Sequence, residues 1–516
     1  MKSQLFVYWF CLLLLGEDNS NVHVSALSTT APDASSSPSS CNQKVVVSTK
    51  KNGGHAKIFT FPEHDAMSGA SSQVSSSESR MKMWIPSLLH PQQAIAKLQS
   101  AIRSTFLPSG YPARTPPGYL RYSAWSWVQD LSTQLRSVLA TQRVLEGVGV
   151  GREGATALSA LLNYLVRDGC GMLATLLFTS IASSKFRTDI KRWRIFADIM
   201  VDIGITLEVA AVVVPQSLFL PMISVGTMCK AMCGVAAGAC GGAINLHWAR
   251  GSDISDINAK FGAQHTVTGA LGLIFAAIFA KSVSTVDPLH MWTLYVALTV
   301  LHIYANTRCM RLIAFDSFNT SRMNMILQEF WTRLEQQPSP SSTNQRSKDP
   351  SVVAISDPNQ VASREPLFFL QASKRRGVPI IFGDSFNEFS KRSQKSPAAL
   401  EQLLQNCRDN YLISSGSTSR GKPCVVVSFR SNITPSQEAK AYFHADLLSR
   451  ELKSEQYDQA DNSNASIQST LQNSEIAVAF SIDEAWKNFQ ASCVQSGWDL
   501  GKTELRTLGY EVEVES

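Results

Sequence analysis

The chain has 516 residues, a net charge of +6, and only 17% charged residues against 44% hydrophobic ones. This charged share lies below the roughly 25% of ordinary soluble domains, and the length allows several domains. The mild positive charge includes no basic tract of the kind that follows nucleic acid, so we expect no nucleic-acid binding. The ten cysteines form no C-x-x-C pair and no cluster at zinc spacing, which predicts small buried residues and no metal site.

The first 26 residues have the pattern of a signal peptide. Lys2 precedes the apolar run Leu5–Leu15, which is too short to cross a bilayer core of about 30 Å. Val24, Ser25 and Ala26 then offer small residues at the positions that a signal peptidase reads. We therefore expect a signal-peptide-like segment over residues 1–26.

Residues 27–83 are expected to be a transit-like segment without regular structure. Residues 27–40 consist mainly of Ser, Thr, Ala and Pro, with Asp33 as their single acid. A signal followed by such a segment resembles the two-step address of algae with secondary plastids. The sequence thus favours a plastid over simple entry into the endoplasmic reticulum.

Residues 84–335 are predicted to form a helical domain. A short helix begins near Gln92, and Trp127, Leu131, Leu135 and Leu139 recur at a spacing of four on the next one. Gly149–Gly154 matches the G-x-G-x-x-G pattern of dinucleotide sites, but a helix precedes it where that site needs a strand. We expect these glycines to form a turn between two closely packed helices.

Long apolar segments follow in this domain. Phe261–Ala280 and Pro288–Thr307 contain no formal charge, and each reaches roughly the 20 residues that span a bilayer. The predicted fold class is therefore mainly α, a multi-helix bundle embedded in or associated with a membrane, with lipid as a partner. Gly234, Gly238 and Gly242 form a ridge at a spacing of four, which predicts close helix packing.

A few polar residues interrupt the apolar segments and form the candidate site. Asp198 and Asp202 lie four residues apart and share a helix face. We hypothesise that Arg167 pairs with one of them across two helices, and that this cluster holds a polar ligand or relays a proton. The alternative is that these residues lie near helix ends and pair for structure alone. The full candidate set is Asn163, Arg167, Asp168, Asp198 and Asp202.

Several separated motifs, in order, resemble the root UVB sensitive family. The motif at 162–169 has Arg167-Asp168-Gly169 where the family usually has Lys-Asp-Gly, and Tyr164 where Trp is common. The resemblance implies a plastid or other membrane-associated helical protein linked to UV-B responses, development and pyridoxal-phosphate homeostasis, with no catalytic residues to transfer. The motifs are Phe106–Pro112, Tyr119–Tyr122, Leu162–Gly169, Lys191–Arg194, Ala197-Asp198 and Asp202.

The end of the chain is expected to be a linker, 336–366, and a small α+β domain, 367–516. Pro397 opens a helix, Tyr411–Ile413 and Cys424–Phe429 read as strands, and Thr434 with Gln437 forms a capping box. Gly416–Lys422 has the spacing of a phosphate loop, but Pro423 and a strand follow it, so we expect a turn.

These features predict a membrane protein without catalysis. Neither a nucleophile–base pair nor a cofactor loop can be identified, and no cofactor is expected. The protein would act in UV-B signalling or in pyridoxal-phosphate homeostasis, through another member of the family or a small-molecule ligand. The alternative is a transporter that uses the Arg and Asp cluster as its substrate or proton site.

Overall fold

The computed structural model describes residues 46–49, 57–60, 91–149, 157–283, 288–336, 352–369, 377–405, 409–430, 432–461 and 482–505. The chain divides into two compact units, Leu15–Ile102 and a larger unit that contains Arg103–Ser516. In the first unit, β1 (Val46–Thr49) pairs antiparallel with β2 (Lys57–Thr60). This hairpin falls in the stretch for which we expected no regular structure, and the signal-like residues 1–26 lie outside the described ones.

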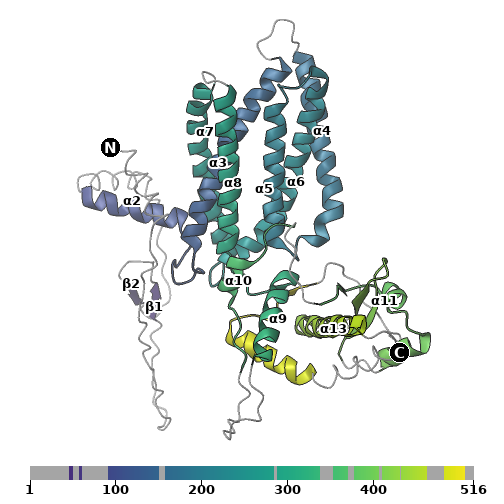
Figure 1. The fold of residues 1–516 in the computed structure, drawn as a ribbon. Helices are drawn as coiled ribbons and strands as arrows, with labels where there is room; N and C mark the ends of the chain where they lie inside the picture. Colours follow the sequence, from purple (N-terminus) through teal and green to yellow (C-terminus); the bar gives the residue numbers. More distant parts are fainter. Residues whose placement is uncertain are drawn as a thin grey trace, which may run out of the picture. The chain divides into compact units, whose positions relative to one another are not determined.

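The helical part of the larger unit is a bundle of long helices that run side by side (Figure 1). The predicted helix near Gln92 exists and is longer than expected, since α2 covers Pro91–Phe106. The bundle helices are α3 (Tyr119–Val148), α4 (Ala157–Ala182), α5 (Ile190–Ala210), α6 (Gln216–Trp248), α7 (Ile254–Val283) and α8 (Pro288–Leu312). The mainly helical fold class is thereby confirmed.

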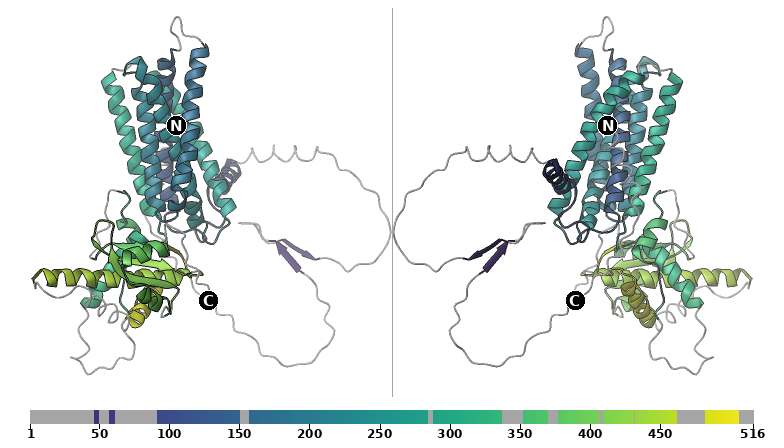
Figure 2. Two further views of the ribbon diagram at one scale, coloured as in Figure 1. Left: turned by 90° about the vertical axis from the view of Figure 1, so that its right-hand side faces the viewer. Right: turned by 90° about the vertical axis from the view of Figure 1, so that its left-hand side faces the viewer.

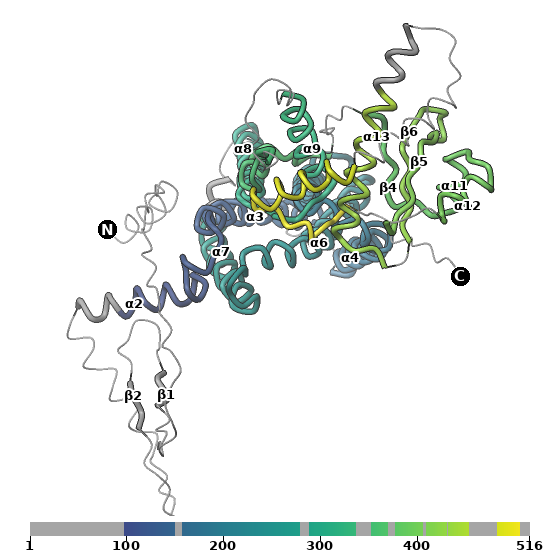
Figure 3. Tube along the Cα trace, turned by 90° about the horizontal axis from the view of Figure 1, so that it is seen from below, coloured from purple at the N-terminus to yellow at the C-terminus, as the bar shows by residue number. Residues whose placement is uncertain are grey.

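The order of packing places α3 and α5 at the centre of the bundle. Helix α5 contacts α6, α3 and α8, and α3 also contacts α8. On either side, α4 packs on α6, and α7 packs on α3 (Figure 3). An aromatic cluster closes one end: Tyr119 and Tyr122 of α3 contact Trp248 of α6 and Phe261 of α7, with ring centroids 5.0–5.9 Å apart. These rings hold the start of α3 against the turn between α6 and α7.

Close helix packing occurs at other glycines than those predicted. A Cβ on Gly204 of α5 would lie 2.6 Å from the carbonyl oxygen of Gly226 on α6, so only glycine allows this crossing. At Gly234, Gly238 and Gly242, by contrast, an added Cβ would have no atom of the described chain within 4 Å. The predicted ridge therefore makes no close packing here, because it lies on a side of α6 that neither α4 nor α5 covers.

Three helices are long and apolar enough to cross a membrane, judged by length and composition. They lie at Ala157–Lys185, Gln216–Trp248 and Ile254–Ile278. The last includes most of the predicted run Phe261–Ala280, whereas α8, which holds the second uncharged run, is not among them. The first continues from α4 into a short 3-10 helix, η3 (Ser183–Lys185).

The remaining elements form the predicted α+β part, which lies against one end of the bundle (Figure 2). Its sheet has the order β4-β6-β5, with β4 parallel and β5 antiparallel to β6. A second, two-residue pair joins β3 to β7 in parallel. The elements are β3 (Phe318–Asn319), α9 (Thr320–Glu335), α10 (Pro358–Arg364), β4 (Ile380–Phe382), α11 (Phe386–Ser393), α12 (Pro397–Gln405), β5 (Tyr411–Ser417), β6 (Pro423–Phe429), α13 (Pro435–Asp461), a helix over 482–495 and β7 (Thr503–Glu504).

Local sequence signals in this part are confirmed. Thr434 Oγ1 accepts from the backbone N–H of Gln437, whose side chain accepts from the N–H of Thr434, so the capping box starts α13. Residues 418–422 turn between β5 and β6, which is incompatible with the phosphate-loop reading. Helix α13 continues as far as Asp461.

The predicted linker is partly folded. Residues 337–351 lie outside the described residues, but 352–366 contribute Val353 and Ile355 to a core with α9 and the helix over 482–495. The prolines and polar residues of this stretch suggested a linker, yet Asp357 caps α10 and Pro358 occupies its first turn. The α+β part therefore begins before residue 367.

Candidate functional site

The interior of the bundle contains a charged network that joins three helices. Arg136 of α3 donates through Nη1 to Asp202 of α5, and Nδ1 of His302 on α8 lies 2.9 Å from the same carboxylate. Arg136, Asp202 and His302 are 0%, 4% and 1% exposed. Since removal of either charge would leave the other buried and unpaired, the network fixes how α3, α5 and α8 pack.

A second polar group lies about one turn away along α5. Asp198 accepts from Nε2 of Gln129 on α3 at 2.6 Å and forms an ion pair with Arg194 on its own helix. Further along, Glu208 pairs with Lys230 of α6. Asp198, Asp202 and Glu208 thus follow one buried side of α5, each with a partner that neutralises or binds it.

The structure contradicts the hypothesised pairing of Arg167 with Asp198 or Asp202. Arg167 forms its ion pair with the neighbouring Asp168, at 2.7 Å, and its guanidinium lies over the Tyr164 ring. The reason is the packing order, because α4 packs on α6 and does not reach the buried side of α5. Asn163 is half-buried on α4, so the five candidate residues separate into a pair on α5 and a group on α4.

Sequence reasoning missed the true partners of the two aspartates. Gln129, Ser132 and Arg136 recur at spacings of three and four on α3, a polar stripe beside the apolar face that we identified. This stripe is buried together with Leu139 of that face, while Trp127, Leu131 and Leu135 are only half-buried. A search for polar stripes in helices of an apolar domain would have found Arg136.

The bundle buries charged and amide side chains beside its apolar core clusters, and it exposes large apolar ones. Buried positions hold charged and amide side chains, including Gln129, Glu208 and Asn306. Neither amide atom of Asn306, one turn after His302, has a hydrogen-bond partner within the described residues. Large apolar side chains are instead exposed along α4, α7 and α8. Examples on these helices are Leu165, Met172, Leu176, Leu273, Ile278, Leu289 and Val300.

An apolar groove on the side of the bundle leads to this network. It has a volume of about 280 Å³ and lies between α5 and α8, with Ile199, Ile203 and Ile303 among its walls. Asp202, Thr206 and Thr299 also line it, so the charged interior is reached from the apolar exterior here.

A buried ion cluster links the bundle to the α+β part. Glu365, which follows α10, lies 2.8 Å from Nζ of Lys191 on α5 and 3.1 Å from Nε of Arg322 on α9. Burial alone would raise the pKa of Glu365, but the charges of Lys191 and Arg322 and their hydrogen bonds lower it to about 2. Glu365 is therefore an anion at neutral pH and ties the two parts together.

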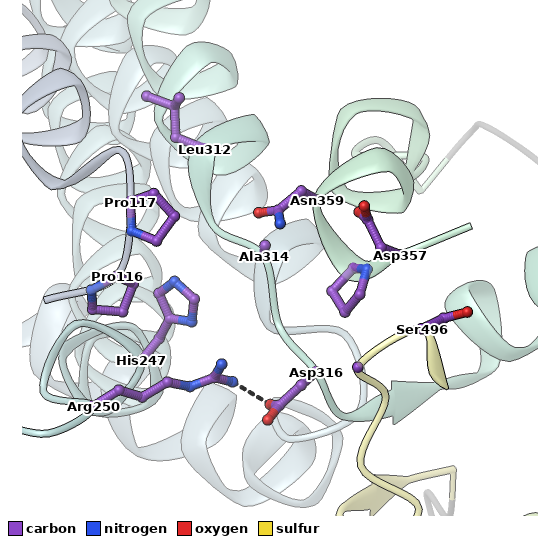
Figure 4. A pocket seen from close by; sticks show the side chains of 12 residues that line it. Pro116, Pro117, His247, Arg250, Leu312, Ala314, Asp316, Asp357, Asn359 and Ser496 are labelled. Atoms are coloured by element: carbon purple, nitrogen blue, oxygen red, sulfur yellow. Dashed lines mark ion pairs between the residues drawn. The ribbon is translucent and has the colours of Figure 1, made fainter. Parts of the chain in front are cut away.

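A polar cavity of about 270 Å³ lies at the same junction (Figure 4). Its walls come from the turn before α3, the end of α6, the segment after α8, the start of α10 and the end of the last described helix. Arg250 and Asp316 form an ion pair on one side, and Asp357 and Asn359 lie across from them. With one guanidinium and two carboxylates among its charged groups, the lining is net negative and does not favour an anion.

No arrangement for a metal or a redox centre is present in the described residues. They contain no group of three His, Cys, Asp or Glu side chains placed to hold a metal ion. The cysteines that can be described are free thiols. Residues 150–154 of the dinucleotide-like motif lie outside the described residues, and Gly149 ends α3 in a left-handed conformation with φ 95°.

Comparison with known proteins gives two consecutive family matches. Residues 92–333 match the vitamin B6 photo-protection and homoeostasis domain, and residues 354–510 match the C-terminal domain of root UVB sensitive proteins. The first match covers the bundle with β3 and nearly all of α9, and the second covers the rest of the α+β part, including residues 354–366 of the predicted linker.

Relatives of known name agree with this match. Protein root UVB sensitive 3 of Arabidopsis thaliana is 34% identical over 44% of this chain and 52% of its own length, and RUS family member 1 of Dictyostelium discoideum is 32% identical over 46% and 45%. This chain therefore spans about half the length of these relatives. Protein root UVB sensitive 5 of Arabidopsis thaliana is 22% identical over 90% of this chain and 86% of its own length. No solved structure matches.

Proposed function

The chain belongs to the root UVB sensitive family, and from this premise we propose that it is a membrane-embedded, non-enzymatic helical protein that serves vitamin B6 homoeostasis in the response to UV-B. The observation that carries the membrane part is the apolar outside of a bundle that holds paired charges in its interior. Arg136, Asp202 and His302 are paired inside it, whereas leucines and isoleucines cover its outside. In water this outside would be a large apolar patch, and in a bilayer it is the expected surface.

The vitamin B6 part of the proposal has a candidate location in the junction cavity. Flat apolar walls from Pro116, Pro117 and Leu312 suit a small ring, and Asn359 and Asp357 offer hydrogen-bonding groups to it. The net negative lining favours a neutral or cationic ligand over a phosphate ester. We therefore propose that the cavity binds an unphosphorylated pyridine vitamer such as pyridoxine.

Membrane embedding is tested by extraction. Membranes from cells that express the full chain are washed with high salt and then with alkaline carbonate, followed by detergent. An embedded protein stays in the pellet until detergent is added. Release by salt or carbonate would show a docked protein and refute this part of the proposal.

Vitamer binding is tested by calorimetry on the full chain in detergent, with pyridoxine and pyridoxal phosphate as probes. We expect pyridoxine to bind more tightly, and Asn359→Leu to weaken its binding about tenfold, equal to about 1.4 kcal/mol. Gln360→Leu is the matched control, because Gln360 is the next residue of α10 and does not line the cavity. Equal weakening by both variants, or no heat with either vitamer, would count against the cavity.

Location and transport are separate proposals. We propose a plastid location, and one relative, Protein root UVB sensitive 2 of Arabidopsis thaliana, is named chloroplastic. Fluorescence of the tagged full chain against a plastid marker tests this. The comparisons give no support to the transporter alternative, and counterflow of pyridoxine into proteoliposomes would detect transport if it occurred.

A further inference from the structure

Helix α4 carries a row of uncovered side chains, the α4 seam, made of Leu158, Leu161, Leu165, Asp168 and Met172. The four apolar members are 60–70% exposed, and the side chain of Asp168 is 51% exposed. Their spacings alternate between three and four residues. This is the heptad period of two helices that pack together along a left-handed crossing, in water or in lipid.

The α4 seam suits neither water nor lipid when it stays uncovered. In water its leucines would form an exposed apolar row. In a bilayer the leucines can face lipid, but an exposed carboxylate is costly there. Asp168 lies about 17 Å along the helix from Ala157 and about 21 Å from Ala182 at 1.5 Å per residue, so it is far from both ends of α4. Another protein surface would therefore cover the leucines in water and Asp168 in a bilayer.

The charges of the seam identify the kind of surface. Arg167 and Asp168 are adjacent and oppositely charged, and Arg167 extends over the ring of Tyr164 to its neighbour. In a symmetric pair of helices each residue lies at the same depth as its copy, so Arg167 of one chain meets Asp168 of the other. The surface is complementary to itself.

We propose that the α4 seam packs against the α4 seam of a second copy of this chain, about a two-fold axis that runs along the bundle. The two Arg167–Asp168 pairs then form a ring of four charges inside an apolar interface. Gly169 has no atom within 4 Å of an added Cβ, so this side of α4 is open to a close neighbour. In this pairing the Arg167 and Asp168 of the family motif at 162–169 bind their copies in the second chain.

Cysteine cross-linking tests the contact in lipid vesicles that contain the full chain. Leu165→Cys lies in the seam and should give several times more disulfide-linked dimer than the unsubstituted chain on mild oxidation. Leu177→Cys is the control, because Leu177 is 53% exposed on α4 but lies about 120° around the helix from Leu165. Equal dimer from both variants, or none from Leu165→Cys, would overturn the proposal.

Charge exchange tests the recognition. Arg167→Asp gives a chain with two adjacent acids, and Asp168→Arg gives one with two adjacent bases. With two different tags, we expect each variant to lose about tenfold in co-purification with itself, and the two variants together to recover it. Undiminished self-association of both, or no recovery in the mixture, contradicts the pairing.

The results of the cross-linking and charge-exchange tests do not depend on the results of the tests of the proposed function. The cysteine variants keep both charges, so cross-linking remains informative if a charge variant does not fold. The pairing proposal uses membrane embedding only to set the direction of the two-fold axis. Carbonate extraction measures embedding whether or not two chains pair.

Discussion

The buried charges of the two networks in this protein are paired with groups from other elements of the chain. Asp202 binds both Arg136 and His302, and Glu365 binds both Lys191 and Arg322. A charge removed from water needs such compensation, and the loss of one partner then costs more than the whole pair contributes. The individual charges are therefore sensitive reporters of how the helices pack.

Arg136→Gln should strongly destabilise the bundle. It leaves the carboxylate of Asp202 buried with a weaker partner, which costs about 3–5 kcal/mol in other proteins. Arg143→Gln, two turns along α3, removes a more exposed pair with Glu146 and should cost less than about 1 kcal/mol. Thermal unfolding of the full chain in detergent measures both. Equal losses would mean that Arg136 is not a central packing residue.

Glu365 should make the stability of the junction depend on pH. Its pKa is lowered from 4.5 to about 2, so its stabilising effect is complete above about pH 4.5 and is lost as the pH falls towards 2. The difference corresponds to about 3 kcal/mol. In urea titrations from pH 7 to pH 2, Glu365→Gln should be less stable than the parent at pH 7, with the gap closing below pH 4.5. Glu401→Gln, on the surface of α12, should leave the parent's profile unchanged. A constant gap for Glu365→Gln would refute this assignment.

At the scale of elements, the sequence predicted most helices and strands because their signals are local. The helix near Gln92, the hairpin of β5 and β6, and the capped start of α13 depend on periodicity, turns and caps within a few residues. Which faces meet is not local. Arg167 was given the wrong partner because nothing in the sequence states that α4 packs on α6, and the glycine ridge was misassigned for the same reason.

The crossing of α5 and α6 should be far less tolerant of a side chain than the predicted ridge. Gly204→Ala would push a methyl group to 2.6 Å from the Gly226 carbonyl, and the overpacking should cost about 1–3 kcal/mol. Gly238→Ala meets open space on α6 and should gain up to about 1 kcal/mol from helix propensity. Thermal unfolding of the two variants compares their stabilities with that of the parent. Similar changes in stability for both variants would rule out the close crossing at Gly204.

At the scale of the molecule, the two family matches meet in one structural unit. The boundary between them was read from the prolines and polar residues as a linker. On its far side, however, Val353 and Ile355 are buried in a core with α9, and Glu365 is paired with Lys191 of the bundle. The composition of this stretch predicted a linker wrongly, because a short capped helix and a few buried side chains change the composition little. The junction also contains the polar cavity, so a ligand there would contact residues of both family domains.

This arrangement predicts that two fragments stay together after a cut in 337–351: one with the bundle, β3 and α9, and one with the rest of the α+β part. Phe318 stacks on Trp498, β3 pairs with β7, and Glu365 is bound by Lys191 and Arg322, so contacts on both sides of the gap at 337–351 hold the parts together. A protease site inserted in 337–351 allows the cut in purified protein. The fragments should co-elute in gel filtration in detergent.

The same cut in a Glu365→Lys background should release the fragments, because three cations would then meet in one buried place. Lys391→Glu is the control for a charge reversal, since Lys391 is 71% exposed on α11 and away from this cluster. Fragments of the parent that separate at once would show that the residues before and after the cut form independent domains. In that case the cavity between them would not be a fixed site, and calorimetry should find no vitamer bound there.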